Sequence, residues 1–403
     1  MPKFQYTATT TAGTVHTGVQ DAPDGASLLA ALRGRGMYAT QIKDVTKVKP
    51  VTSMFTSKIK VTALSMFCSQ MATVLRAGVP LATALEIMHD QVEDQALKKI
   101  LADVAQKLQI GRSLTEAFTP FQDRFPQMFI NMLEAGEASG ALDQCLRRAG
   151  DTFTKQAKMN SKIKAAMAYP MVLLGLTLVI TVFLIVFIIP QFAETYAETG
   201  TELPAITTFL LGVSSFVATR WLPLILGIAA VIFLFRVWLN SDRGRTAFDM
   251  FKLKLPIIGK LQLTICAGRY TRTLSTMNAA GVPLTSSLEV TARSLNNRWL
   301  QKKVESMIED VRMGSSLTAP LERMNIFPKL ITHMTRLGEE SGSLDELLEQ
   351  SAVFYEEESD NAIAAMTAMM EPAIIVIMGV LIGTVVLGIM QPMFGSVINA
   401  GNG

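Results

Sequence analysis

The sequence predicts a mainly α-helical, polytopic membrane protein with two tandem cytoplasmic helical-bundle domains, three transmembrane helices and a small N-terminal α/β module. Three observations lead to this fold class: long apolar stretches without charge, an internal repeat, and apolar residues at helical spacing between glycine and proline stops. Only 18% of the 403 residues are charged, whereas soluble proteins carry about 25%. The apolar residues must therefore be concentrated in segments that lipid can cover.

The N-terminal residues 1–46 are expected to form a β-β-α-β module. Phe4–Ala8, Thr14–Val19 and Tyr38–Val45 alternate as strands do, and Ser27–Arg35 has the pattern of a short helix. The order predicted after this module is a linker (47–58), a first helical domain (59–170), a first span (171–190), an external loop with an interfacial helix (191–220), a second span (221–239), a basic linker (240–261), a second helical domain (262–371), a third span (372–391) and an external C-terminal tail (392–403).

Three stretches are long enough to span a bilayer, which takes about 20 apolar residues. Met171 to Ile189 and Ala373 to Met390 contain no charged residue, and Trp221 to Trp238 has tryptophan at both ends, as interfacial belts do. Residues 205–219 are apolar as well. One straight helix through both of the latter segments would be about 45 Å long, too long for a single crossing. We therefore expect 205–219 to be an interfacial or packed helix on the outer side, and the sequence leaves open whether it enters the membrane.

Basic residues flank the spans on one side only. Lysines precede the first span and basic residues follow the second, whereas residues 190–219 contain acids but no Lys or Arg. The positive-inside rule then predicts that both helical domains are cytoplasmic, with the N-terminus inside and the C-terminus outside. The first residues contain no apolar stretch typical of a signal peptide, which agrees with a cytoplasmic N-terminus.

An internal repeat covers about 125 residues per copy. The sequence AGVPL at 77–81 recurs at 280–284, GRSLT at 111–115 recurs as GSSLT at 314–318, and GEASG at 136–140 recurs as GEESG at 338–342. Glycine ends a helix by adopting a left-handed conformation, and proline begins the next helix at its first turn. The predicted turn residues are Gly78, Pro80, Gly281, Pro283, Gly111 and Gly314. Each copy should form a bundle of about six helices, and its last helix has no stop signal before the membrane.

No catalytic motif or cofactor site is found in the sequence. It contains no Walker A sequence, no H-E-x-x-H and no nucleophile elbow, so we expect a protein that is not an enzyme and binds no cofactor or catalytic metal. The three cysteines, Cys68, Cys145 and Cys266, are far apart and are expected to be free, buried thiols. A formal net charge of +3 without a basic run gives no support for nucleic-acid binding.

Acidic residues in the GExSG motifs are the first candidate contacts. The candidate set for a partner or a cation is Glu137, Asp143, Glu339 and Asp345. The alternative is that each motif is a helix terminus with a solvated carboxylate. The sequence of the third span also contains Gly379 and Gly383 in a GxxxG pattern, which either favours close helix packing or belongs to a span that tolerates glycine.

The two copies differ where they enter the membrane. Tyr169-Pro170 of the first copy corresponds to Glu371-Pro372 of the second, and Glu371 is either solvated at the interface or paired in a helix interface. Just before these positions, Lys155 and Lys158 align with Glu357 and Asp360. The hypothesis is that these segments face each other, within a chain or between chains, and partly neutralise one another.

The repeated GVPL, GxSL and GExSGxLD motifs, together with Leu203-Pro204-Ala205-Ile206-Thr207 after the first span, resemble the inner-membrane platform proteins of type IV pilus and type II secretion machines. The resemblance covers nearly the whole chain. It implies a non-catalytic adaptor whose cytoplasmic domains engage a hexameric assembly or retraction ATPase and whose membrane part handles pilin subunits. It also implies homo-oligomers, dimers or larger, and contact with other inner-membrane pilus components.

Gly-Val-Pro in both copies is more similar to the pilus branch of this family than to its secretion branch, so a type II secretion platform is the alternative. A transporter or channel is disfavoured because no charged residue lies deep in a span. A membrane receptor is disfavoured by the repeat and by the lack of a signalling motif in the sequence.

Overall fold

The computed structural model describes residues 3–10, 15–21, 27, 34, 37–44, 58–198 and 204–401. The chain divides into two compact units, Met1–Lys58 and Ile59–Gly403, each of which is described separately.

The first unit contains a three-stranded antiparallel sheet in the order β2-β1-β3. Its strands are β1 (Lys3–Thr10), β2 (Val15–Asp21) and β3 (Met37–Asp44). Tyr6 in the central strand lies opposite Gly18 on one side and Ile42 on the other. Most of the predicted helix Ser27–Arg35 and nearly all of the predicted linker lie outside the described residues, so the complete β-β-α-β module stays a prediction.

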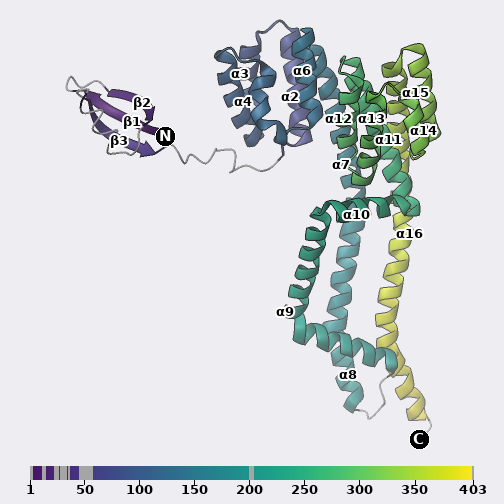
Figure 1. The fold of residues 1–403 in the computed structure, drawn as a ribbon. Coiled ribbons are helices and arrows are strands. Elements are labelled where there is room, and N and C mark those ends of the chain that lie inside the picture. The colour runs from purple at the N-terminus through teal and green to yellow at the C-terminus, as the bar shows by residue number, and fades with distance from the viewer. Residues whose placement is uncertain are drawn as a thin grey trace. The chain divides into compact units, whose positions relative to one another are not determined.

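The second unit begins with the first copy of the repeat, copy 1 (Figure 1). Its helices are α2 (Val61–Arg76), α3 (Leu81–Gln91), α4 (Gln95–Gln109), α5 (Leu114–Phe118), the 3-10 helix η2 (Thr119–Arg124), α6 (Gln127–Ser139) and α7 (Leu142–Phe183). Four phenylalanine rings on different elements pack together in the core, at Phe67, Phe118, Phe125 and Phe129. Such clusters contribute directional ring contacts beyond the area they bury.

Copy 2 repeats this arrangement. Its helices are α11 (Pro256–Ala279), α12 (Leu284–Ser294), α13 (Arg298–Arg312), α14 (Thr318–Met324), α15 (Lys329–Ser341) and α16 (Leu344–Gly401). Tyr270 is fully buried in its core, and its ring centroid lies 4.8 Å from that of Phe327. Because both copies are helical bundles whose last helix continues into an apolar segment, the predicted fold class of a mainly α polytopic membrane protein is confirmed.

The same turns separate the helices of both copies. All four glycines predicted to stop helices have positive φ, between +75° and +89°: Gly78, Gly111, Gly281 and Gly314. Pro80 and Pro283 directly precede α3 and α12. A residue with a β-carbon is strained in this left-handed region, which explains why glycine occupies the equivalent turn positions of both copies.

Among the described residues, three helical stretches are long and apolar enough to cross a membrane, and they contain α7, α9 and α16. Helix α7 continues through a π-helical segment, η3 (Leu184–Ile188), into α8 (Ile189–Glu198). Helix α9 (Ala205–Asn240) changes direction at Arg220, whose backbone is not helical (Figure 1). The two parts of α9 correspond to the outer segment 205–219 and to the second span.

The N-terminal part of α9, before Arg220, packs on the ends of the other two spans. The Thr207 hydroxyl donates a hydrogen bond of 2.7 Å to the carbonyl of Gly388 in α16. Leu210 forms a buried cluster with Ile189 and Val385. This segment is therefore a packed helix within the chain.

The segment predicted as a basic linker, 240–261, is largely helical. It forms α10 (Asp242–Lys254) and the first turn of α11. The apolar run in this segment is short. The segment is held to α13 by Asp242, which binds Arg298 and Lys302, and by Asp249, which accepts the backbone N–H of Arg298. These tertiary contacts stabilise a helix that its polar sequence alone did not indicate. Helix α16 likewise continues to Gly401, through most of the predicted tail.

Candidate functional site at the repeated motifs and the necks

The glutamate of each GExSG motif caps a neighbouring helix. The Glu137 carboxylate accepts the backbone N–H groups of Leu114 and Thr115, the latter at 2.9 Å, at the start of α5. In copy 2, Glu339 accepts the corresponding N–H groups of Leu317 and Thr318. The first N–H groups of a helix have no partner within it and carry partial positive charge, so an anion there is stabilising.

The two glycines of each motif act in different ways: the first allows a close approach of the next helix, and the last ends its own helix. A β-carbon at Gly136 would lie 2.9 Å from the Leu142 Cα, and one at Gly338 would lie 2.8 Å from the Leu344 Cα. The last glycine, Gly140 or Gly342, ends the helix with positive φ. The motif therefore joins three neighbouring helices in each copy: its own helix, the one that follows, and the short helix that its glutamate caps.

This geometry bears on the candidate contacts for a partner or a cation. The carboxylate oxygens of both glutamates accept backbone N–H groups, which favours the interpretation of each motif as a helix terminus. Asp143 lies 3.7 Å from Arg76 Nε, and Asp345 is in the first turn of α16. Within the described residues, no group of three or more His, Cys, Asp or Glu side chains is placed to hold a metal ion.

The two necks, defined as residues 147–170 of α7 and 349–372 of α16, lie side by side. Lys155 Nζ lies 3.4 Å from Glu356 and 3.9 Å from Glu349, and Lys162 Nζ lies 2.5 Å from Asp360. The necks therefore face each other within the chain, but the ion pairs join other residues than those aligned in the sequence.

Two of the charges proposed to pair have no such partner. Lys158 and Glu357 are both exposed, and neither makes an ion pair with any residue that the structure describes. The hypothesis that Lys158 pairs with an acid therefore has no contact within this chain to support it.

A buried arginine, which sequence reasoning missed, joins the necks to copy 2. Arg272 on α11 binds Glu349 through Nη1 and Glu356 through Nε, the latter at 2.7 Å, and its side chain is only 8% exposed. Burial alone would lower the pKa of Arg272, but hydrogen bonds and charges from Glu356 and Glu349 raise it. Lys155 shares the same two glutamates, so four charged side chains from three helices form one network.

The Arg272 network is part of a longer seam between α7, α11 and α16. On the membrane side of the network, Arg269, whose pKa is lowered by burial, donates a hydrogen bond of 3.3 Å to Asn160. On the side away from the membrane, the hydroxyl groups of Thr152 and Thr276 lie 3.0 Å apart and are buried. Closest to the membrane, an apolar cluster joins the three helices: Leu261, Ile265 and Ile363, with Met159, Ile163, Ala166, Ala362 and Met366 packed against them. The only trace of the seam in the sequence is a pair of arginines one turn apart, within an otherwise uncharged stretch of α11.

The residues at the start of the spans lie apart from these contacts. Tyr169 is exposed and Pro170 is buried within α7, whereas Glu371 and Pro372 are both exposed on α16. No ion pair of Glu371 is found among the described residues, so the structure gives it no partner in a helix interface.

The GxxxG glycines do not approach another helix of this chain. A β-carbon at Gly379 or Gly383 would meet no atom within 4 Å. At Gly388, which the sequence reading did not select, a β-carbon would lie 2.5 Å from the Leu210 Cδ1. Close helix packing within the chain therefore occurs at Gly388.

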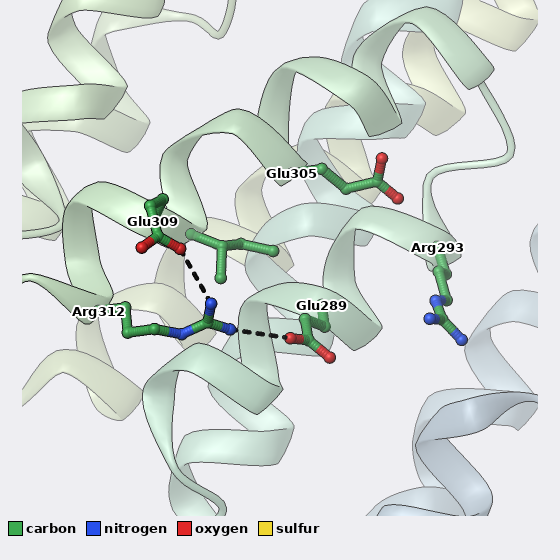
Figure 2. A pocket seen from close by; sticks show the side chains of 6 residues that line it. Glu289, Arg293, Glu305, Glu309 and Arg312 are labelled. Atoms are coloured by element: carbon green, nitrogen blue, oxygen red, sulfur yellow. Dashed lines mark hydrogen bonds and ion pairs between the residues drawn. The ribbon is translucent and has the colours of Figure 1, made fainter.

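A cavity of about 350 Å³ lies between α12 and α13 (Figure 2). Arg312 binds Glu309 at 2.9 Å and Glu289 at 3.6 Å across it, while Arg293 lies apart from these charges. In copy 1 the equivalent contact is a hydrogen bond of 3.3 Å from Gln109 to Glu86. Because the charged side chains that line it are exposed and Arg312 joins the two helices through Glu289, the cavity has the character of a surface groove.

Comparison with known proteins identifies relatives of the whole chain. The sequence model of the family "Type II secretion system (T2SS), protein F" matches residues 67–190 and 270–392, one match per repeat copy, and the model of the N-terminal domain of the same protein matches residues 1–43. A type IV pilus assembly protein PilC of Pseudomonas aeruginosa is 35% identical over 84% of this chain and 90% of its own length. PilC of Thermus thermophilus is 32% identical over 98% of both chains. A type II secretion system protein F of Aeromonas hydrophila is 31% identical over 90% of this chain and 94% of its own.

Proposed function

The chain belongs to the type II secretion system protein F family, and on this basis we propose that it is a non-enzymatic inner-membrane platform protein of type IV pilus biogenesis. In this role it couples a hexameric cytoplasmic assembly or retraction ATPase to the insertion or removal of pilin subunits. It acts as a homo-oligomer together with other inner-membrane pilus components. The PilC relatives are assembly proteins of type IV pili by name, and they cover nearly all of this chain.

The continuity of the necks carries the mechanical part of the proposal. Each bundle ends in a helix that runs into the membrane without a break in the backbone near the bilayer surface, α7 over Leu142–Phe183 and α16 over Leu344–Gly401. The Arg272 network and the neck ion pairs tie these helices to each other on the bundle side. A rotation or push applied to the bundles by a motor would therefore be transmitted to the spanning helices.

The proposed role requires both bundles on the motor's side of the membrane. Basic residues before the first span and after the second support a cytoplasmic position for both bundles, with the N-terminus inside and the C-terminus outside. The second span is what returns the chain to the cytoplasm between the two copies.

A platform of type II secretion is the second candidate. The Aeromonas hydrophila and Vibrio cholerae relatives named type II secretion system protein F are 31% and 29% identical over at least 90% of this chain. Fold and repeat are shared by both branches, so the preference for the pilus branch rests on Gly-Val-Pro in both copies and on the 35% and 32% identity of two of the PilC relatives.

Deletion of the gene tests the proposal and separates the two branches. If the pilus role is right, the deletion strain lacks surface pili and regains them with the wild-type gene. Normal piliation with loss of exoprotein release would instead assign the chain to secretion. Neighbouring genes for a pilin, a prepilin peptidase and an assembly ATPase would agree with the first outcome.

A further inference from the structure

The two repeat copies contact each other through different faces. Copy 1 contributes α6 and α7, whereas copy 2 contributes α11, α12 and, along the necks, α16. Met277, Val282 and Val290 of copy 2 are buried within the hydrophobic core cluster of copy 1. The contact is thus heterologous: the copies are arranged head-to-tail rather than about a two-fold axis (Figure 1).

Because the copies are repeats, each face used in this contact has an unused equivalent. The counterpart of the α6–α7 face is the α15–α16 face of copy 2, and the counterpart of the α11–α12 face is the α2–α3 face of copy 1. Among the described residues, α2 and α3 have no extensive contact with copy 2, and α15 has none with copy 1. Helix α16 contacts α7 through Glu349, Glu356 and Asp360, whereas its residues Phe354 and Glu357 stay exposed. A heterologous contact leaves complementary free faces at its two ends, which continue the same contact with another subunit.

The free α15–α16 face carries apolar side chains at positions equivalent to those that copy 2 covers on the α6–α7 face of copy 1. Thr152, buried against Thr276, corresponds in the repeat to Phe354, which is 49% exposed. Next to it Val353 is 42% exposed, and Leu337 on α15 is 52% exposed. Large apolar side chains grouped on the surface of a water-exposed domain are typical of an interaction surface.

The free α2–α3 face has matching residues. Val74, Val79 and Ile87 correspond to the three residues of copy 2 that are buried in the core of copy 1, and they are only partly buried. Met66, the counterpart of the half-buried Arg269, is 61% exposed. The apolar character of the contact is therefore kept at the free end.

The charges are also complementary, with their signs exchanged. Within the chain, Lys155 of α7 faces Glu349 of α16. The counterpart of Lys155 on the free face of copy 2 is Glu357, and the counterpart of Glu349 on copy 1 is Arg147. Both Glu357 and Arg147 are exposed and make no ion pair with the described residues.

We propose that a second copy of this chain docks its α2–α3 face on the α15–α16 face of the first, and so repeats the contact between the two bundles. Phe354 then lies against Thr73 of the second chain, as Thr152 lies against Thr276, and Glu357 faces its Arg147. All necks enter the membrane from the same side in such an array. The inference deepens the proposed function, because it rests on the oligomeric platform and names the surface through which it forms.

Cysteine bridging in membranes tests the contact directly. Phe354→Cys is placed in a chain with one affinity tag and Thr73→Cys in a chain with another, and the two are co-expressed and treated with a short bis-maleimide. The expected product is a mixed-tag dimer, absent for the wild type, whose three cysteines are buried. The matched control replaces Thr73→Cys by Gln122→Cys, an exposed position on η2, which should lower the mixed product at least tenfold.

The template contact is measured by oxidation to a disulfide, because its two side chains are buried and lie 3.0 Å apart. Thr152→Cys with Thr276→Cys in one chain should bridge within the chain, as mass spectrometry of the linked peptides shows. Bridging of Phe354→Cys with itself would indicate a two-fold interface and overturn the proposal. So would a bridged template without the mixed dimer, or a template that does not bridge at all, since the repeated contact would then be absent.

A charge exchange provides an independent arm. Glu357→Arg and Arg147→Glu alone should each reduce the mixed dimer by up to about fivefold, the effect of one exposed ion pair, and together they should restore it. A double variant that stays as low as the single ones contradicts the predicted pairing. Bridging reports assembly alone, so a deletion strain with normal pili would refute the proposed function and leave this result standing.

Discussion

Replacing Glu137 by Gln removes one of the two helix-capping bonds in copy 1. The carboxylate accepts the N–H groups of Leu114 and Thr115, and the amide of Gln offers one acceptor oxygen to these two donors. A hydrogen bond to a charged group contributes about 1.5–3 kcal/mol net, and the charge at a helix N-terminus adds about 0.3–1 kcal/mol. We expect Glu137→Gln to lower the free energy of unfolding of copy 1 by about 2–3 kcal/mol.

Buried thiols report the unfolding of each copy separately. Cys68 lies in the core of copy 1 and Cys266 in that of copy 2. Burial raises the pKa of the Cys68 thiol, and it raises that of Cys266 to about 11, so neither reacts with a maleimide until its bundle opens. The protein in detergent is heated in steps, labelled briefly and digested, and the labelled fraction of each cysteine peptide is measured by mass spectrometry.

The predicted result is a lower labelling midpoint for Cys68 and an unchanged midpoint for Cys266. One kcal/mol shifts the midpoint by about 4–8 °C for a domain of about 100 residues, so a loss of about 2–3 kcal/mol should shift it by roughly 8–24 °C. Glu134→Gln, an exposed glutamate on the same helix, is the matched control and should change neither midpoint. If Glu137→Gln behaves like this control, the carboxylate does not cap α5 and the reasoning is refuted.

Three other perturbations can be followed with the same labelling assay. Gly136→Ala places a β-carbon 2.9 Å from the Leu142 Cα and should destabilise copy 1 by about 1–3 kcal/mol. The control Gly175→Ala, whose β-carbon would meet no atom within 4 Å, should not. Equal Cys68 midpoints for the two variants would contradict the close approach at Gly136. Arg272→Leu leaves two glutamates near each other without their buried cation. It should lower the labelling midpoint of Cys266 by the equivalent of about 2–3 kcal/mol, which is less than for a fully buried pair because one glutamate is half exposed. An unchanged midpoint would argue against the network. The pKa of Asp242 is lowered by hydrogen bonds from Lys302 and Arg298, so its stabilising effect is present above the unfolded pKa of about 3.9 and is lost as pH falls through the folded pKa. The difference in midpoint between wild type and Asp242→Asn should therefore be seen at pH 7 and vanish in acid. A difference that grows toward low pH would contradict the lowered pKa.

The helices of both bundles could be predicted because their stops are local. A glycine such as Gly78 ends a helix through its own backbone conformation, so the signal lies in a few adjacent residues and recurs in both copies. The spans could be predicted for the same reason, since length and apolar composition decide whether a segment crosses a bilayer. The family resemblance, confirmed by the match of both repeat copies, rests on these same motifs.

Contacts between distant segments could not be predicted in the same way. Glu137 bonds to backbone N–H groups, which leave no mark on the partner's sequence. Which glycine of a span meets another helix depends on the direction that helix faces, so Gly388 and not the GxxxG pair lies against α9. The neck pairing was aligned between equivalent positions, but the head-to-tail arrangement of the copies brings Lys155 to Glu356 and Lys162 to Asp360 instead.

The account depends most on both bundles lying on the same, cytoplasmic side of the membrane. Single exposed cysteines at Gln122 in copy 1, Lys303 in copy 2 and Ser215 in the outer part of α9 can be labelled in intact cells with a membrane-impermeant maleimide. We predict that Ser215→Cys reacts from outside, while Gln122→Cys and Lys303→Cys react only after the inner membrane is permeabilised. Labelling of either bundle in intact cells would contradict the arrangement in which one motor engages both copies.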